Sequence, residues 1–325
     1  GVRPSTRDEF AIPGAFILSD GAGRNRFPIK AAADGGGSEM PLTKDEVRQL
    51  LETAHQTMSA ARGQIRRPLN QSARVSMVVV DTTGEILGLV IGSDAPIFGL
   101  DVAVQKARTA TFFSSELAAT YLVGLNRDEI SDYVQRVRVF LNDPLALTGQ
   151  HAFSDRAGGN LSRPYFPDGE LGRPHGPLSR PITEWSPFAT GLQESLVRPE
   201  LVKHLGFVDG LSEDPGANEC VGLLNEGGDI HLLGNGIQIF PGSVPIYRGS
   251  TLIGGIGVSG DGVDQDDMIA FLSVHLAGEA SGTFGNAPKE IRADTIEVDN
   301  VRLRYISCPF NPFLDESEQE VCNGK

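Results

Sequence analysis

The clearest pattern along the chain is a helical one that begins near residue 43. Apolar residues recur every three or four positions over 44–63, the spacing that places them on one face of an α-helix. Thr43 and Glu46 stand at the spacing of a capping box, in which each side chain accepts a hydrogen bond from the other residue's backbone amide. We therefore predict an amphipathic helix over 44–63, with this apolar face: Val47, Leu50, Leu51, Ala54, Met58 and Ala61.

Shorter apolar runs separated by turn residues predict β-strands. One strand is predicted from Val75 to Val80 and a second from Ile86 to Ile91, joined by a turn sequence, DTTG. The hairpins and helices do not follow the βαβ alternation of a parallel sheet. The predicted fold class is therefore α/β of the α+β type, with an antiparallel sheet flanked by helices. The other predicted elements are a hairpin over 244–260, helices over 101–122, 127–141 and 264–278, and an extended segment over 295–308.

Three parts of the chain lack such regular patterns. Residues 1–40 are rich in glycine, alanine, proline and charge, so we expect an N-terminal arm or linker. Between about 123 and 235, proline, glycine and polar residues dominate, which is typical of a long irregular insertion lying over the core. Residues 281–325 form a C-terminal extension. The chain within 41–280 is then one domain that the insertion interrupts.

The chain carries a large negative charge. It has 28 Lys and Arg against 42 Asp and Glu, a formal net charge of −14. Such a surface repels nucleic acid and anionic lipid, so neither is an expected partner. No stretch approaches the ~20 apolar residues of a membrane span. Gly1 is not followed by a charged-then-apolar leader, which fits either removal of a signal segment or a chain cut from a longer one.

The three cysteines predict one disulfide. Cys308 and Cys322 bracket a short tail, CPFNPFLDESEQEVC, that has little apolar content and therefore gains most from a covalent link. Two free thiols, or pairing with Cys220, are the alternatives. A disulfide favours export to the periplasm or the extracellular space.

A literal GxGxxG at 255–260 lies ahead of the last predicted helix. A dinucleotide site needs a βαβ unit with a free helix N-terminus, whereas this strand belongs to a hairpin and acidic residues follow it. We interpret the glycines as positions where a helix, a partner chain or a flat ligand approaches the strand closely. Capping and interaction with the helix dipole explain the acidic residues better than calcium binding does. They are Asp261, Asp264, Asp266 and Asp267.

The sequence contains no standard hydrolase or zinc motif. G-x-S-x-G, H-E-x-x-H and C-x-x-C are absent, and no two of the six histidines stand four residues apart. We assign no catalytic residue and no metal site. His55 flanks the apolar face of the first helix, and His275 lies near the buried face of the last. Near a core, a histidine is more often a hydrogen-bonded packing residue than a ligand.

The segment QKARTATFF, residues 105–113, carries the most specific local chemistry. Lys106, Thr109 and Phe113 share one helical face. Lys106 on an otherwise buried helix could pair with an acidic ligand group such as a propionate, or could extend its ammonium group into solvent. Both remain open. A stripe of small residues that allows close approach lies beside it: Ala103, Ala107 and Ala110.

Two longer segments resemble the GlcG/HbpS-like family of small haem-binding domains. Residues 74–115 have the family's order of strand, D-x-x-G turn, strand, acid-alanine-proline loop and a helix with a KARTA run. Residues 242–271, which read GSVPIYRGSTLIGGIGVSGDGVDQDDMIAF, are similar to its hairpin, GxGVSG motif and acid-led helix. The helix at 43–63 also matches in position, so the resemblance covers roughly half of the chain.

The resemblance implies a profilin-like fold, self-association into a homo-oligomer, and binding of haem or a related tetrapyrrole. Axial ligation of the iron is not constant in the family, so His55 and His275 are candidate ligands. The ligand-facing positions carry over to Lys106 and Thr109 on the helix and to Gly254, Gly255 and Ser259 on the facing hairpin.

The chain departs from the family in its arm, its insertion and its cysteine-bracketed tail. The insertion could cover the family's pocket, replace its oligomer interface or form a new site. A group of its aromatic residues would suit a protein partner, although we favour the interpretation that they attach the insertion to the core. They are Tyr165, Phe166, Trp185 and Phe188.

These observations lead to three hypotheses. The first is an exported, non-catalytic haem-binding or haem-sensing protein. The second is an accessory or structural subunit of a larger extracellular or periplasmic assembly, which has kept the fold without the ligand. The third and least favoured is an enzyme that acts on a small acid through Lys106.

Overall fold

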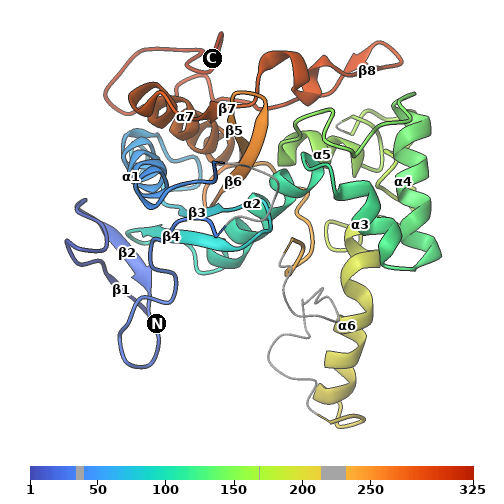
Figure 1. Cartoon of the computed structure of the whole chain (residues 1–325), viewed down its shortest axis with the longest axis horizontal. Coiled ribbons are helices and arrows are strands. Elements are labelled where there is room, and N and C mark those ends of the chain that lie inside the picture. Colours follow the sequence, from blue (N-terminus) through green and yellow to red (C-terminus); the bar gives the residue numbers. More distant parts are fainter. Residues whose placement is uncertain (34–39, 168, 214–231) are drawn as a thin grey trace.

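The computed structural model describes residues 1–33, 40–167, 169–213 and 232–325 (Figure 1). Its central element is a seven-stranded sheet in the order β1-β2-β4-β3-β6-β5-β7. Every pair of neighbouring strands is antiparallel, which confirms the predicted fold class. The strands are β1 (Val2–Pro4), β2 (Ala15–Leu18), β3 (Ser76–Val80), β4 (Ile86–Gly92), β5 (Ser243–Arg248), β6 (Thr251–Ser259) and β7 (Gly285–Asn286).

Helices cover both faces of this sheet. The helices α1 (Lys44–Ala60) and α7 (Val263–Ser281) pack against each other on one face, and α2 (Gly99–Phe113) packs on the other (Figure 1). The side chains of β3 alternate between the two layers, because successive residues of a strand point to opposite faces. Met77 belongs to the core that contains α1, and Val78 packs with the alanines of α2.

The predicted capping box starts α1. The Thr43 hydroxyl accepts a hydrogen bond from the Glu46 amide (3.2 Å), and the Glu46 carboxylate accepts one from the Thr43 amide (2.9 Å). Glu46 also pairs with Arg248 at the end of β5 (3.0 Å). Burial would raise the pKa of Glu46, but hydrogen bonds from Arg248, Thr283 and Thr43 outweigh it and lower the pKa to about 2. This carboxylate therefore joins α1 to the β5–β6 hairpin.

The helix predicted over 101–122 is two helices. The first, α2, ends at Phe113, and α3 (Ala118–Gly124) follows it. Ser114 lies at the break, where its hydroxyl donates to the Phe153 carbonyl (3.2 Å) and accepts from the Phe153 amide (2.9 Å). Serine side chains that bond to backbone groups in this way compete with helix continuation. The helix predicted over 127–141 is α4 (Asp128–Phe140).

The first forty residues differ from the expected arm or linker. β2 pairs with β4 at Ala15↔Gly92, and β1 pairs with β2, so both strands extend the sheet. Phe10 and Ile17 are buried in the main core. These strands span only three and four residues, too short for a periodic pattern to be recognised in the sequence.

The insertion contains two helices that were not predicted. Besides the predicted α4 it has α5 (Asp155–Leu161) and α6 (Leu192–Val208), and α6 extends away from the sheet (Figure 1). Glycines in α5 and Pro199 within α6 lower the helix propensity of both segments, so tertiary packing must stabilise them. Side chains of the insertion join the main core, among them Phe153, Leu161, Phe166, Leu178, Leu192 and Leu196.

The C-terminal extension packs back onto the domain. It contains two short 3-10 helices and a hairpin of β8 (Glu297–Val298) and β9 (Val301–Arg302). Cys308 and Cys322 form the predicted disulfide, while Cys220 lies outside the described residues. In the tail between them, the Leu314 amide bonds to the Ala60 carbonyl at the end of α1 (3.0 Å). Across the described ranges, no helix combines the length and the apolar composition needed to cross a membrane.

Candidate ligand-binding site

The helix α2 approaches the backbone of β6 closely. In the sheet register, Val80 and Val78 of β3 lie beside Gly255 and Gly257 of β6. A Cβ at Gly257 would overlap the Ala103 carbonyl oxygen, and one at Gly255 would overlap the Thr111 hydroxyl. These glycines of the GxGxxG sequence therefore admit the chain's own helix, and no space is left there for a diphosphate or a flat ligand.

The other two hairpin positions taken from the resemblance are also enclosed. Gly254 has φ +154°, and a Cβ there would overlap the Val80 carbonyl oxygen. Ser259 is buried with an exposed fraction of 2%. A Cβ at Gly99, the first residue of α2, would overlap the carbonyl oxygen of Ser259. Among the described residues, the chain's own atoms therefore fill the space at both Gly254 and Ser259.

Lys106 lies inside the protein. Its side chain is 2% exposed, and its ammonium group donates to the Asp266 carboxylate (2.9 Å) and to the Val258 carbonyl (2.8 Å). The interpretation that Lys106 extends its ammonium group into solvent is therefore wrong. In this structure Asp266 of α7 supplies the negative charge that pairs with the ammonium group.

Lys106 belongs to a buried cluster of charged residues. Arg156 of α5 donates to Asp267 (2.5 Å) and to Asp264 (2.6 Å), both near the start of α7. Asp155, next to Arg156, is fully buried. The cluster ties the insertion to α7.

Burial raises the pKa of each fully enclosed acid in this cluster. The pKa of Asp266 rises to about 6, because burial outweighs the opposing charge and hydrogen bond of Lys106. Burial raises the pKa of Asp267 against the opposing effect of Arg156. The pKa of Asp155 is raised well above its ordinary value by burial, with only partial compensation from Lys106 and Ser243. Asp155 is therefore the acid of this group that is most strongly held in the protonated form.

The acidic residues around the start of α7 have structural roles. Asp264 and Asp266 stand in the first turn of the helix, where negative charge complements the helix dipole. Gly262 occupies the N-cap position, and Asp261 accepts hydrogen bonds from the amides of Gln64 (2.6 Å) and Gly262 (2.8 Å). Within the part of the chain that the structure describes, no group of three or more His, Cys, Asp or Glu residues could hold a metal ion.

Thr109 lies under the returning end of the insertion. It is fully buried, and its hydroxyl accepts from the Gln238 amide (2.8 Å) while donating to Gln105 (2.7 Å). The side chains of Gln238 and Gln105 bond to each other (2.8 Å). Gln105 also donates to the carbonyl of Asn235 (2.6 Å). Residues 232–240, which we call the covering segment, therefore occupy the face of α2 that the resemblance assigns to a ligand.

The two candidate histidines lie on the other side of the sheet from Thr109, on α1 and α7. His55 is buried, and its Nε2 atom has no hydrogen-bond partner among the described residues. Burial lowers the pKa of His55, and Gly14 partly opposes the shift. His275 is partly exposed, and burial lowers its pKa; the charge of Glu279 opposes this shift, while the positive charges of Lys325 and Arg292 add to it. A single ligand in contact with Thr109 could reach neither imidazole.

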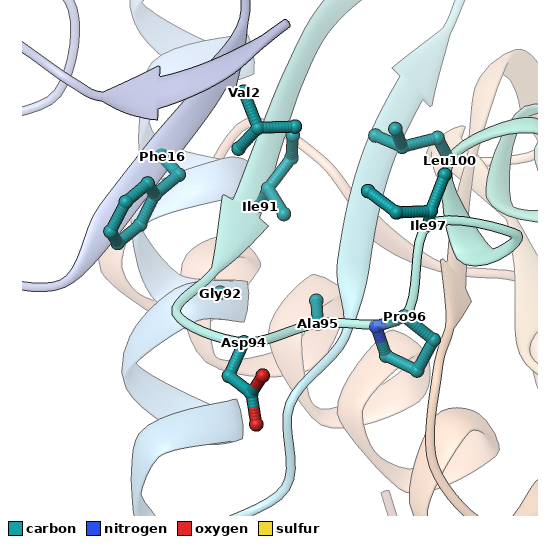
Figure 2. Close-up of a pocket in the computed structure, with 9 residues that line it drawn as sticks. All are labelled: Val2, Phe16, Ile91, Gly92, Asp94, Ala95, Pro96, Ile97 and Leu100. Atoms are coloured by element: carbon teal, nitrogen blue, oxygen red, sulfur yellow. The ribbon is translucent and has the colours of Figure 1, made fainter.

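Two surface cavities lie close to the family-like segments. The smaller, about 140 Å³, is an apolar pocket between β1, β2, β4 and the loop before α2. Figure 2 shows Ile91, Ile97 and Leu100 around it, with the Asp94 carboxylate pointing away from them. The larger, about 540 Å³, lies between the turn after β3, the end of α2 and the β5–β6 hairpin. We call it the hydroxyl cavity, after its hydroxyl-bearing lining residues: Thr82, Ser114, Ser115, Tyr247, Ser250 and Thr251.

The hairpin and α7 carry a family match. Residues 215–274 match the HbpS-like family, 'haem degrading protein HbpS-like'. This confirms the resemblance predicted from the sequence. The match contains the segment 242–271, whereas the segment 74–115 lies outside it. No curated protein matches the chain.

Two solved structures are similar to this chain at low identity. The crystal structure of a PduOC:haem complex is 16% identical, with a TM-score of 0.32, and the alignment covers 73% of this chain and 95% of that one. Klebsiella pneumoniae protein ORFY, of the DUF336 family model, is 13% identical with a TM-score of 0.32, over 74% of this chain and 94% of that one.

The residues at the HbpS-like ligand positions do not fit a haem in this conformation. Lys106, Thr109 and Ser259 are almost fully buried, and their neighbours in the protein fill the space around them. Sequence reasoning missed two of the contacts that close these positions, the ion pair of Lys106 with Asp266 and the hydrogen bond from the Gln238 amide to Thr109. A polar Gln238 within the apolar run Gly236-Ile-Gln-Ile-Phe240 was the available signal for the second.

Proposed function

We propose that this protein is an exported, non-catalytic haem- or tetrapyrrole-binding protein that assembles as a homo-oligomer. The observation that carries the proposal is the HbpS-like match over residues 215–274, which includes the β5–β6 hairpin and the first part of α7. The disulfide between Cys308 and Cys322 supports export, since disulfides persist in oxidising compartments. Enclosure of Lys106 in an ion pair gives no support to catalysis through that residue.

His275 is the better of the two candidate iron ligands. An imidazole must be neutral to bind iron, and burial favours the neutral form of His275 by lowering its pKa, with nearby cations adding to the shift and Glu279 opposing it. Arg292 and Lys325, the cations involved, would also attract the propionates of a haem. His55 shares the lowered pKa, but its Nε2 atom is buried in the protein.

Titration of the purified protein with hemin tests the proposal. We expect a saturable, shifted Soret band in the wild type and in His55→Ala, and loss of that band in His275→Ala. If haem binding survives both substitutions, the haem-binding proposal stands but His275 is not the iron ligand. Absence of a saturable band in the wild type would reject haem binding itself.

The covering segment favours a second candidate function, an accessory subunit that has kept the fold without the ligand. Its bonds to Thr109 and Gln105 close the α2 face with the chain's own atoms. Such a subunit would stay colourless with hemin and co-purify with a partner. The insertion offers an exposed aromatic contact for a partner in Phe188, which is 90% exposed. By contrast, Phe166 is buried in the core, as the attachment hypothesis predicts.

A further inference from the structure

The second half of α6 exposes apolar side chains to solvent. Its first half is anchored, since Leu192 and Leu196 are fully buried in the main core. Further along the helix, Leu201, Leu205 and Val208 are 44%, 50% and 63% exposed. These three residues stand at positions i, i+4 and i+7, so they form one apolar stripe, which we call the α6 stripe. Figure 1 shows this part of α6 extending away from the sheet.

A specific contact lets α6 continue past Pro199. Proline has no amide hydrogen, so it leaves the carbonyl four residues earlier without its helical partner. That carbonyl belongs to Ser195, and it accepts a hydrogen bond from the guanidinium group of Arg127, just before α4. The exposed half also contains Gly206, which lowers its helix propensity further. A short helix of this composition is marginal by itself, so packing against a partner would stabilise it.

The charges beside the α6 stripe fit a second copy of this chain. Arg198 and Asp209 are exposed and stand about three helical turns apart, so they lie along the same edge of the stripe. In an antiparallel pair of α6 helices, Arg198 of each copy lies beside Asp209 of the other. The same arrangement sets Leu201 against Val208, with Leu205 of both copies at the centre. A parallel pair would instead bring like charges together. The pattern is therefore complementary to itself across a two-fold axis.

A lipid surface fits the α6 stripe less well. Helices that lie in a membrane interface carry a polar face rich in lysine and arginine. In the segment 198–209, the basic residues Arg198 and Lys203 are balanced by Glu200 and Asp209. The whole chain has a net charge of −14, which disfavours anionic lipid. A second copy of the chain is therefore the better-matched occupant.

We propose that two copies of this protein associate through antiparallel packing of their α6 stripes. The inference rests on the homo-oligomer of the proposed function and names its interface. Burial of the leucine and valine side chains of both copies supplies the apolar contact. The two pairs of Arg198 with Asp209 set its direction. The insertion then supplies an oligomer interface, one of the roles that the sequence left open for it.

The mass of the assembly in solution, measured by light scattering after size exclusion, tests the proposal. We expect the wild type to be a dimer or a larger assembly of dimers. Leu205→Glu places two carboxylates at the centre of the interface and should halve this mass. Leu171→Glu is the matched control, because Leu171 is an exposed leucine of the insertion outside α6. It should keep the wild-type mass.

Exchange of the edge charges tests the antiparallel direction, and it keeps the proposal testable if Leu205→Glu fails to fold. Arg198→Asp sets like charges beside each other at two places and should raise the dissociation constant of the dimer by roughly tenfold. Adding Asp209→Arg restores opposite charges and should return the constant to the wild-type value. An interaction within one copy could not explain this rescue, since about three helical turns separate the two residues there.

Each contrary result has a distinct meaning. An unchanged mass in Leu205→Glu, or no rescue by Asp209→Arg, overturns the α6 interface while a homo-oligomer built on another surface stands. A monomeric wild type overturns both the α6 interface and the proposed homo-oligomer, and the Soret band then tests haem binding separately. Binding of a monomeric wild type to phosphatidylcholine vesicles, lost in Leu205→Glu, would overturn the proposal and assign the stripe to a lipid surface.

Discussion

At the scale of single residues, the role of Lys106 depends on a partner that is 160 positions away in the sequence. The helical pattern places this lysine correctly on a mostly buried helix. The identity of its counter-charge follows only from packing of α7 beside the sheet, which brings Asp266 within 2.9 Å of the ammonium group. A buried charge needs such a partner, because burial without one is very costly.

Lys106→Met should therefore destabilise the fold strongly. Removing one partner of a buried ion pair leaves the other charge uncompensated, at a cost of roughly 3–5 kcal/mol. The free energy of unfolding in urea at pH 7 measures the effect. Lys44→Met, at an exposed position of α1, is the control and should change it little. Adding Asp266→Asn to Lys106→Met should recover part of the loss. A single Lys106→Met variant as stable as the wild type would show that the pair contributes nothing.

At the scale of elements, the packing of α2 on β6 depends on small residues in both. The sequence has an alanine stripe in one segment and a GxGxxG in the other, and it predicts that a helix, a partner chain or a flat ligand approaches the glycines closely. The structure shows that the helix does so. The alanines of α2 that contact the sheet face β3 valines and β6 glycines in one layer.

Gly257→Ala tests this contact. The new methyl group would overlap the Ala103 carbonyl oxygen, and a backbone atom within a helix cannot move aside independently. We expect a loss at or above the usual range for overpacking, roughly 1–3 kcal/mol, in urea unfolding. Gly124→Ala, at the end of α3 with nothing near its added Cβ, is the control and should be neutral. Equal stability of the two variants would contradict the close approach.

At the scale of the whole molecule, the insertion and the tail are integral to one core. Aromatic and aliphatic side chains of the insertion join the main apolar cluster, and the covering segment completes the outer face of α2. The tail bonds to the end of α1 and is closed by the disulfide. The long segments that distinguish this chain from the GlcG/HbpS-like domains it resembles thus bury the very surface that the resemblance assigns to a ligand.

Replacing both tail cysteines tests the contribution of the disulfide. Cys308→Ala combined with Cys322→Ala opens a loop with a sequence separation of 14 residues. The chain-entropy argument predicts a loss of about 3 kcal/mol for a loop of this length. The midpoint of urea unfolding should fall in this variant and in the wild type with reductant. It should stay unchanged in Cys220→Ala, and a fall there would instead indicate that Cys220 takes part in pairing.

The local elements of this protein can be predicted from the amino-acid sequence alone. The helices α1, α4 and α7, the strands β3 to β6 and the capping box at Thr43 follow from periodicity and turn chemistry, which act between near neighbours. The family resemblance rested on the same local segments. Which surfaces are free depends on how distant parts of the chain pack together. Short edge strands, glycine-rich α5, the Lys106 ion pair and the covering segment over Thr109 all depend on contacts between distant residues. No local pattern encodes such contacts, because burial and charge pairing are set by the packing of the whole chain.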